Sequence, residues 1–256
     1  APLFVFADTD IFAKAPARLT AAGVSDILGK YIALADWKIA SILMDEYYCT
    51  AVVDLETKAI RTVKDNLKEI AAGEKDACEK LMYALILSGL AMQMTGNSRP
   101  ASGAEHHMVH LWDMEVVNGH LDALRRGEVS AATMLVLLEY KKLADAIRRG
   151  ACRVHAFTDG DRELLQKTFG RKRDYLEHLK KKTTPELLDD VSTETLSGAL
   201  PEILKIIDLL PAVTDMQEMM SIVGCVSRGP GYVGTAGEKT IEESLRLATV
   251  YKGIRD

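Results

Sequence analysis

Apolar side chains recur at helical spacing along most of this chain, and this pattern constrains its fold more than any other feature. Residues 25–49 carry an apolar stripe, and residues 74–94 are apolar on nearly every side. A stripe at this spacing predicts a helix, and an apolar character all round predicts that the helix is buried. Further helices are expected at residues 50–72, 102–117, 129–147, 161–169, 171–182, 202–210, 216–223 and 238–251. The sequence therefore predicts an all-α, multi-helix bundle with residues 74–94 at its centre.

Two short segments, Leu3–Phe6 and Arg153–Phe157, have the pattern of strands. A single strand is not stable without a sheet. Leu3–Phe6 is therefore expected to be the last strand of a preceding domain, and the sequence also stops inside an expected helix. We expect residues 1–12 to end one domain and residues 13–256 to form a helical domain.

Composition narrows the class of protein. With 256 residues the chain is long enough to bury the core of one domain. Its net charge of -5 argues against a nucleic-acid-binding surface. No apolar run reaches membrane-spanning length. The four cysteines match no zinc-ligand spacing and are expected to be buried thiols, which favours a cytoplasmic protein.

The segment Asn97–His110 holds three of the six histidines within five residues. A loop rich in Ser, Pro and Gly leads there into an apolar stretch that predicts a helix. His106 and His110 are four residues apart and so share one face of it, whereas His107 points off that face. Imidazoles at a helix start are typical of a metal or proton-transfer site. The alternative is a surface loop followed by a helix with polar histidines.

Asp26 also has two interpretations. Ser25 is a candidate N-cap, which would place Asp26 in the first helical turn, where the helix dipole stabilises a carboxylate. In the functional interpretation Asp26 is a metal ligand, and Lys30, one turn further on, meets an anionic substrate. The residues alone leave both open.

Arg99 and His120 have a structural and a functional interpretation each. The planar fork of Arg99 suits a carboxylate or phosphate of a substrate, but equally an ion pair. His120 could reach the same cavity as His106 or could cap a helix end. Carboxylate and imidazole together suit zinc or a similar divalent cation. Such a cation, with one open position, polarises a hydroxyl or carbonyl oxygen.

Several blocks together resemble a known family. They are Ala15-Pro16, Ala22-Gly23, Asp26-Ile-Leu-Gly-Lys30, Ala35-Asp36-Trp37 and Ser98-Arg-Pro-Ala-Ser-Gly-Ala-Glu-His106. In order and separation they resemble glycerol-1-phosphate dehydrogenases (AraM-like proteins), within the superfamily of iron-containing alcohol dehydrogenases and dehydroquinate synthases. The resemblance implies two domains, an α/β domain that binds NAD(P) and a helical domain that holds a metal. This chain resembles the helical domain with the last strand of the nucleotide domain.

The resemblance also implies roles for individual residues. Asp26 and His106 would be metal ligands, and His110 would face the substrate or nicotinamide as the catalytic residue. The predicted contacts to a small phosphorylated polyol are Lys30, Ser98, Arg99 and His107. The metal would be zinc, with nickel or iron as alternatives. Phospholipid metabolism and a homo-oligomer are further expectations from the resemblance.

One departure concerns the third metal ligand, a histidine ahead of a helix in the family. The matching stretch here is Arg125-Arg126-Gly127-Glu128-Val129, and an arginine cannot ligate zinc because it stays protonated. Either His120 substitutes, or two protein ligands hold the metal, or the site is degenerate. No glycine-rich dinucleotide motif is present either, so the chain alone is expected to be inactive.

Three functions therefore remain open. The first is the metal-binding domain of a dehydrogenase that interconverts sn-glycerol-1-phosphate and dihydroxyacetone phosphate. The second is other chemistry of the superfamily, such as a dehydroquinate-synthase-like reaction or an alcohol dehydrogenase. The third is a degenerate, non-catalytic module.

Overall fold

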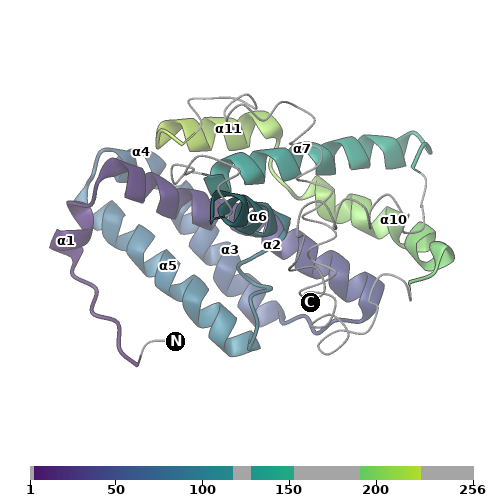
Figure 1. Ribbon diagram of the computed structural model, residues 1–256, viewed down its shortest axis with the longest axis horizontal. Coiled ribbons are helices and arrows are strands. Elements are labelled where there is room, and N and C mark those ends of the chain that lie inside the picture. The colour runs from purple at the N-terminus through teal and green to yellow at the C-terminus, as the bar shows by residue number, and fades with distance from the viewer. Residues whose placement is uncertain (1–2, 118–127, 153–190, 226–256) are drawn as a thin grey trace.

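The computed structural model describes residues 3–117, 128–152 and 191–225, and every regular element in these ranges is an α-helix (Figure 1). The all-α prediction is therefore confirmed. The helices are α1 (Thr9–Ala13), α2 (Ala17–Met44), α3 (Thr50–Lys64), α4 (Leu67–Ala71), α5 (Lys75–Thr95), α6 (Ala104–Val117), α7 (Glu128–Arg148), α10 (Thr193–Asp208) and α11 (Val213–Ile222). The helices expected at 161–169, 171–182 and 238–251, and the extended segment Arg153–Phe157, lie outside these ranges. None of the described helices is long and apolar enough to span a membrane.

The long helix α2 occupies the centre of the bundle. It contacts α3, α4, α5, α6, α7, α10 and α11. Its apolar side chains, including Val24, Ile27, Leu28 and Ile32, are fully buried. Small residues also let neighbouring helices approach: a side chain at Gly29 would come within 3.3 Å of Thr133 in α7. Burial on several sides explains how α2 can position polar groups deep inside the protein.

The helix at residues 74–94, which the sequence predicts to be central, is α5. It does not lie at the centre of the bundle but packs mainly on α3 and α1. One side of α5 is exposed and carries Tyr83, Leu90 and Met94. The sequence shows that α5 is apolar all round, but it does not show which neighbours are available to cover it. The central helix is instead α2, which is long and has small residues such as Gly29 where its neighbours approach.

The strand expected at Leu3–Phe6 is not formed in the described part of the chain. The segment forms no regular secondary structure, and Leu3 and Phe6 are 94% and 96% exposed. A strand requires a neighbour to accept and donate its backbone hydrogen bonds. After it, the Asp8 side chain accepts hydrogen bonds from the backbone N–H groups of Asp10 and Ile11 and so begins α1. The predicted boundary at residue 12 therefore falls inside α1.

Several helix boundaries differ from the prediction; α10, for example, begins at Thr193 and not at residue 202. Ser25 is not an N-cap, because α2 already begins after Pro16 and Ser25 is buried in its interior. The helix expected at 50–72 is two helices, since Asp65 and Asn66 separate α3 from α4. The amide of Asn66 donates to the carbonyl of Thr62 and terminates α3 without any glycine or proline.

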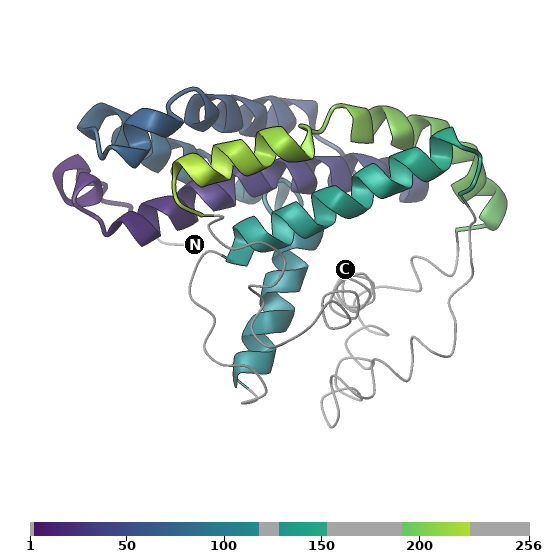
Figure 2. The same ribbon diagram turned by 90° about the horizontal axis from the view of Figure 1, so that it is seen from above.

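The loop between α5 and α6 brings the histidine segment to α2. Gly96 has a φ of 72°, a left-handed conformation that ends α5, and its N–H bonds the carbonyl of Met92. The loop turns at Ser98, whose carbonyl accepts from the N–H groups of Ala101 and Ser102. α6 then runs away from the layer of other helices, as Figure 2 shows. Only the first turns of α6 therefore lie against the bundle, and these turns carry the histidines.

Candidate metal-binding site

Asp26 of α2 and His106 of α6 meet at the junction of the two helices. Oδ1 of Asp26 lies 3.1 Å from Nε2 of His106. Asp26 lies beyond the first turn of α2, so stabilisation of its carboxylate by the helix dipole does not explain its presence. The structure thus brings together two residues that are eighty positions apart in sequence.

His106 is also held by a second carboxylate. Its Nδ1 lies 2.8 Å from Oε1 of Glu105. Burial lowers the pKa of His106, but hydrogen bonds to Asp26 and Glu105 outweigh this effect and raise the pKa to about 9. Burial raises the pKa of Asp26, but the His106 hydrogen bond and the charge of Lys30 outweigh it and hold that pKa well below its ordinary range. At neutral pH the metal-free pair is an ion pair.

Lys30 lies one turn after Asp26, as the sequence predicts, and its ammonium group is buried. Nζ donates to Oδ2 of Asp26 at 2.9 Å and to the carbonyl of Ala101 at 3.1 Å, and Lys30 is 2% exposed. Lys30 therefore fixes one oxygen of Asp26 and leaves the other directed at His106.

Glu56 of α3 is a further buried carboxylate near Lys30. Burial raises the pKa of Glu56, and the charge of Lys30 opposes this rise.

Arg99 pins the loop that precedes α6. Its Nε and Nη2 donate to the two carboxylate oxygens of Glu46 at 2.6 and 2.7 Å, and Arg99 is 8% exposed. This bidentate pair matches the ion-pair interpretation of Arg99. A substrate phosphate would have to replace the Glu46 carboxylate to use the same fork. Ser98, in the same loop, is exposed and shapes the turn through its carbonyl.

The other histidines predicted to belong to the site are His107, His110 and His120. The rings of His106 and His110 lie 6.3 Å apart between centroids, in agreement with the predicted shared face. His107 is buried in the first turns of α6. His120 and Arg126 lie outside the described residues. The metal-ligand roles of Asp26, His106 and His120 all stay predictions.

The chemistry of the Asp26–His106 pair fits a divalent cation of the zinc type. A carboxylate oxygen and an imidazole nitrogen face each other, and a carboxylate holds the other imidazole nitrogen. This is the usual environment of a histidine that ligates zinc. In residues 3–117, 128–152 and 191–225 no group of three His, Cys, Asp or Glu side chains could hold a metal. Within these ranges Asp26 and His106 are the two predicted metal ligands that lie within hydrogen-bonding distance of each other.

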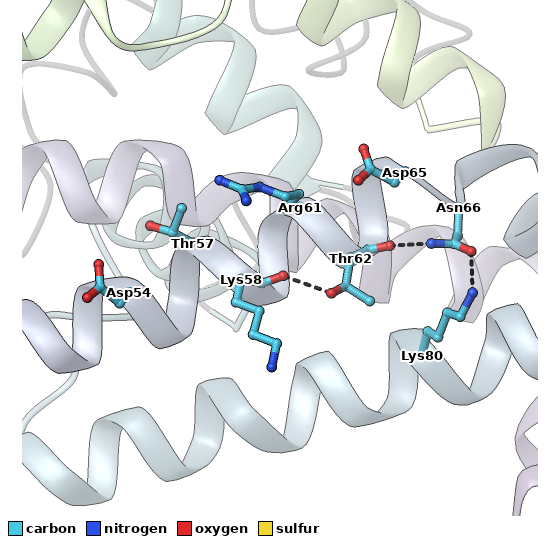
Figure 3. Close-up of a pocket in the computed structure, with 8 residues that line it drawn as sticks. All are labelled: Asp54, Thr57, Lys58, Arg61, Thr62, Asp65, Asn66 and Lys80. Carbon is cyan, nitrogen blue, oxygen red and sulfur yellow. Dashed lines mark hydrogen bonds between the residues drawn. The ribbon is translucent and has the colours of Figure 1, made fainter.

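A separate polar hollow of about 660 Å³ lies on α3 and α5 (Figure 3). Its lining residues are Asp54, Thr57, Lys58, Arg61, Thr62, Asp65, Asn66 and Lys80. Charges of both signs line it, and Lys80 already donates to Oδ1 of Asn66 at 2.7 Å. None of the predicted site residues is there, so the hollow is not the site that the sequence indicates.

Sequence reasoning missed the polar groups that support the site. In the sequence, Glu105 and Asp36 stand out only as members of the blocks that resemble the family. In the structure Oδ2 of Asp36 accepts a hydrogen bond from the N–H of Ala104 at 2.7 Å, and the hydroxyl of Tyr140 donates to Oδ1. Burial, then the carboxylate of Asp36, raise the pKa of Tyr140 well above its ordinary value. Tyr140 carried no signal, because a tyrosine at helical spacing is normally a core residue.

No known protein-family model matches this chain. It is 30% identical to a glycerol-1-phosphate dehydrogenase [NAD(P)+] of Geobacillus stearothermophilus over 249 residues, which are 97% of this chain and 54% of that protein. It is 42% identical over 145 residues to the protein of that name from Halalkalibacterium halodurans, and 36% identical over 149 residues to the one from Pyrococcus horikoshii. These two matches cover 56% and 57% of this chain and 36% and 43% of the relatives. The chain thus spans about half the length of the curated relatives it matches, or less.

Proposed function

Because this chain belongs to the glycerol-1-phosphate dehydrogenase family, we propose that it supplies the metal- and substrate-binding domain of such an enzyme. The reaction would interconvert sn-glycerol-1-phosphate and dihydroxyacetone phosphate with NAD(P) as the hydride carrier. The observation that carries the proposal is the contact of 3.1 Å between Asp26 and His106. It joins the two residues that the family resemblance assigns to the metal.

Asp26 and His106 would hold the cation, with His120 as the expected third ligand. When bound, the cation would polarise the substrate oxygen that becomes the ketone of dihydroxyacetone phosphate. The ammonium of Lys30 fixes Oδ2 of Asp26, so that Oδ1 stays directed at His106. The two protein groups therefore need little rearrangement around a cation.

His110 is proposed to take the proton that leaves the substrate hydroxyl. It lies one turn beyond His106 on the same face of α6, with 6.3 Å between ring centroids. The nicotinamide, when bound, would take a hydride from the carbon that bears this hydroxyl, so that the C–O bond would become a carbonyl. Lys30, Ser98, Arg99 and His107 are proposed as substrate contacts. For Arg99 this role requires Glu46 to yield its place to the phosphate.

The NAD(P) site is proposed to belong to an α/β domain, with residues 1–12 as its end and residues 13–256 as the helical domain. The exposure of Leu3 and Phe6 supports this proposal, because side chains of that size are usually covered. A homo-oligomer and a cytoplasmic location are expected on the resemblance alone.

Metal titration tests this function most simply. Zinc is added to the metal-free chain and to Asp26→Ala and His106→Ala, with Asp76→Ala, an exposed carboxylate of α5, as the matched control. We expect the first two variants to lose zinc binding and the control to keep it. If the unaltered chain takes up no zinc, the degenerate module is the better account. Activity of a protein that also contains the nucleotide domain, on glycerol-1-phosphate and on other polyols, separates the two dehydrogenase alternatives.

A further inference from the structure

Glu105 is a fully buried carboxylate that the proposed reaction does not use. It lies in the first turn of α6, between the loop and His106. Oε1 accepts a hydrogen bond from the N–H of Gly103 at 3.0 Å and lies 2.8 Å from Nδ1 of His106. In the described part of the chain, Oε2 has no hydrogen-bond partner. Burying a carboxylate that lacks a hydrogen-bond partner on one oxygen costs free energy, so the contacts of its other oxygen, Oε1, require an explanation.

The contact with His106 fixes the direction of the imidazole ring. A carboxylate oxygen accepts hydrogen bonds, as Oε1 of Glu105 does from Gly103, so this contact places the hydrogen on Nδ1 of His106. With Nδ1 turned toward Glu105, Nε2 is turned toward Oδ1 of Asp26, at 3.1 Å. Glu105 thereby determines that Nε2 is the ring nitrogen of His106 that faces Asp26.

The backbone around Glu105 is itself held tightly against α2. The N–H of Ala104 donates to Asp36, which also accepts from Tyr140 of α7. A Cβ at Gly103 would lie 2.8 Å from the Cα of Ala33 and 2.7 Å from Oε2 of Glu105, so only glycine permits this approach. Glu105 therefore has little freedom to turn away from His106.

We propose that Glu105 is the positioning residue of the site: it holds Nδ1–H of His106 so that Nε2 faces Asp26 and the cation between them. This inference rests on the proposed function for the presence of the cation. Histidines that ligate metals commonly donate their second nitrogen to a carboxylate, and loss of that partner weakens metal binding by about 10- to 100-fold.

The test compares Glu105→Leu, which cannot accept a hydrogen bond, with Glu105→Gln, whose amide oxygen still can. The control is Thr133→Val, a buried side chain whose hydroxyl has no hydrogen-bond partner in the described residues. Zinc affinity is measured by competition with a chelator, and thermal unfolding verifies the fold of each variant. We expect Glu105→Leu to bind zinc about 10- to 100-fold more weakly, Glu105→Gln to lose less, and Thr133→Val to match the unaltered chain. Equal affinity in Glu105→Leu and the unaltered chain would overturn the inference.

A second readout needs no metal. Proton–nitrogen NMR of the metal-free chain, assigned with His106→Gln, should show a slowly exchanging Nδ1–H of His106. We expect this signal in the unaltered chain, Glu105→Gln and Thr133→Val, and its loss in Glu105→Leu. Its absence from the unaltered chain would refute the positioning role. A chain that shows the signal but binds no zinc would support the positioning role and contradict the proposed function.

Discussion

Nε2 of His106 and Oδ1 of Asp26 lie 3.1 Å apart, and each is held from its other side, His106 by Glu105 and Asp26 by Lys30. The four side chains thus alternate in charge along a short chain of hydrogen bonds when His106 is protonated. Two consequences are measurable: the stability of the metal-free chain depends on pH, and a cation must displace the His106 proton.

The first prediction concerns unfolding as a function of pH. The pKa of His106 is about 9 in the folded chain, against 6.5 ordinarily. Because the folded value is higher, its stabilisation is complete below about pH 6.5 and is lost as pH rises through about 9. The difference corresponds to at most about 3 kcal/mol. Urea unfolding in the presence of a chelator should show the free energy of unfolding falling over this range.

His106→Gln is the control for that measurement, since glutamine has no proton to lose. Its stability should change less between pH 6.5 and 9 than that of the unaltered chain. Identical pH profiles for the two proteins would contradict the assigned ion pair. Because the pKa of Asp26 is lowered, its own contribution is present above about pH 4 and is lost at more acidic pH.

The second prediction concerns metal affinity. Zinc binds the neutral imidazole, so it must displace the proton of His106. Below the pKa of about 9, affinity should therefore rise by about tenfold per pH unit. Competition with a chelator of known pH dependence at pH 6.5, 7.2 and 8.0 measures this slope. A slope of zero would mean that zinc binds without His106.

The third prediction concerns Gly103, which lies against the backbone of α2. Gly103→Ala places a methyl group 2.8 Å from the Cα of Ala33, and backbone cannot give way cheaply. We expect a loss of about 1–3 kcal/mol in the free energy of unfolding, together with weaker zinc binding. Gly89→Ala in α5 is the matched control, because nothing lies within 4 Å of its new methyl group. That variant should be neutral or more stable, by up to about 1 kcal/mol.

The fourth prediction distinguishes the two interpretations of Arg99. A double-mutant cycle with Arg99→Ala and Glu46→Ala, followed by urea unfolding, should give a coupling energy of about 1–3 kcal/mol for the bidentate pair. Additive effects would show that the pair contributes nothing to stability. Loss of substrate affinity on Arg99→Ala but not on Glu46→Ala would identify Arg99 as the phosphate contact.

The fifth prediction concerns the hydroxyl of Tyr140. Tyr140→Phe removes a donor to the carboxylate of Asp36, which also receives the N–H of Ala104 at the start of α6. The expected cost is about 1–3 kcal/mol in the free energy of unfolding, because a buried acceptor loses a partner. Thermal unfolding of the variant measures it. Unchanged stability would mean that Tyr140 does not support the start of α6.

Helices were predictable from the sequence where the apolar period was unbroken, as in residues 74–94, which became α5. Their boundaries were less predictable. Pro16 precedes α2, whereas Ser25 only resembled an N-cap, and the break at Asn66 depends on a side-chain hydrogen bond that leaves no pattern. The prediction of a strand at Leu3–Phe6 was wrong, because a strand needs a neighbouring strand that this segment does not itself supply.

The site was predictable only in part. Spacing alone put His106 and His110 on one face of α6, but no local pattern connects His106 to Asp26, and only the family resemblance paired them. Glu105 and Tyr140 were missed because their roles come from burial between helices. Such contacts follow from packing and not from spacing along the chain.

The most direct measurement of the central claim is a crystal structure of the zinc-soaked protein with anomalous scattering recorded at the zinc edge. We predict one zinc ion at about 2.0–2.2 Å from both Nε2 of His106 and a carboxylate oxygen of Asp26, with Nδ1 of His106 still bonded to Glu105. Zinc bound elsewhere, with the direct Asp26–His106 hydrogen bond intact, would contradict the account.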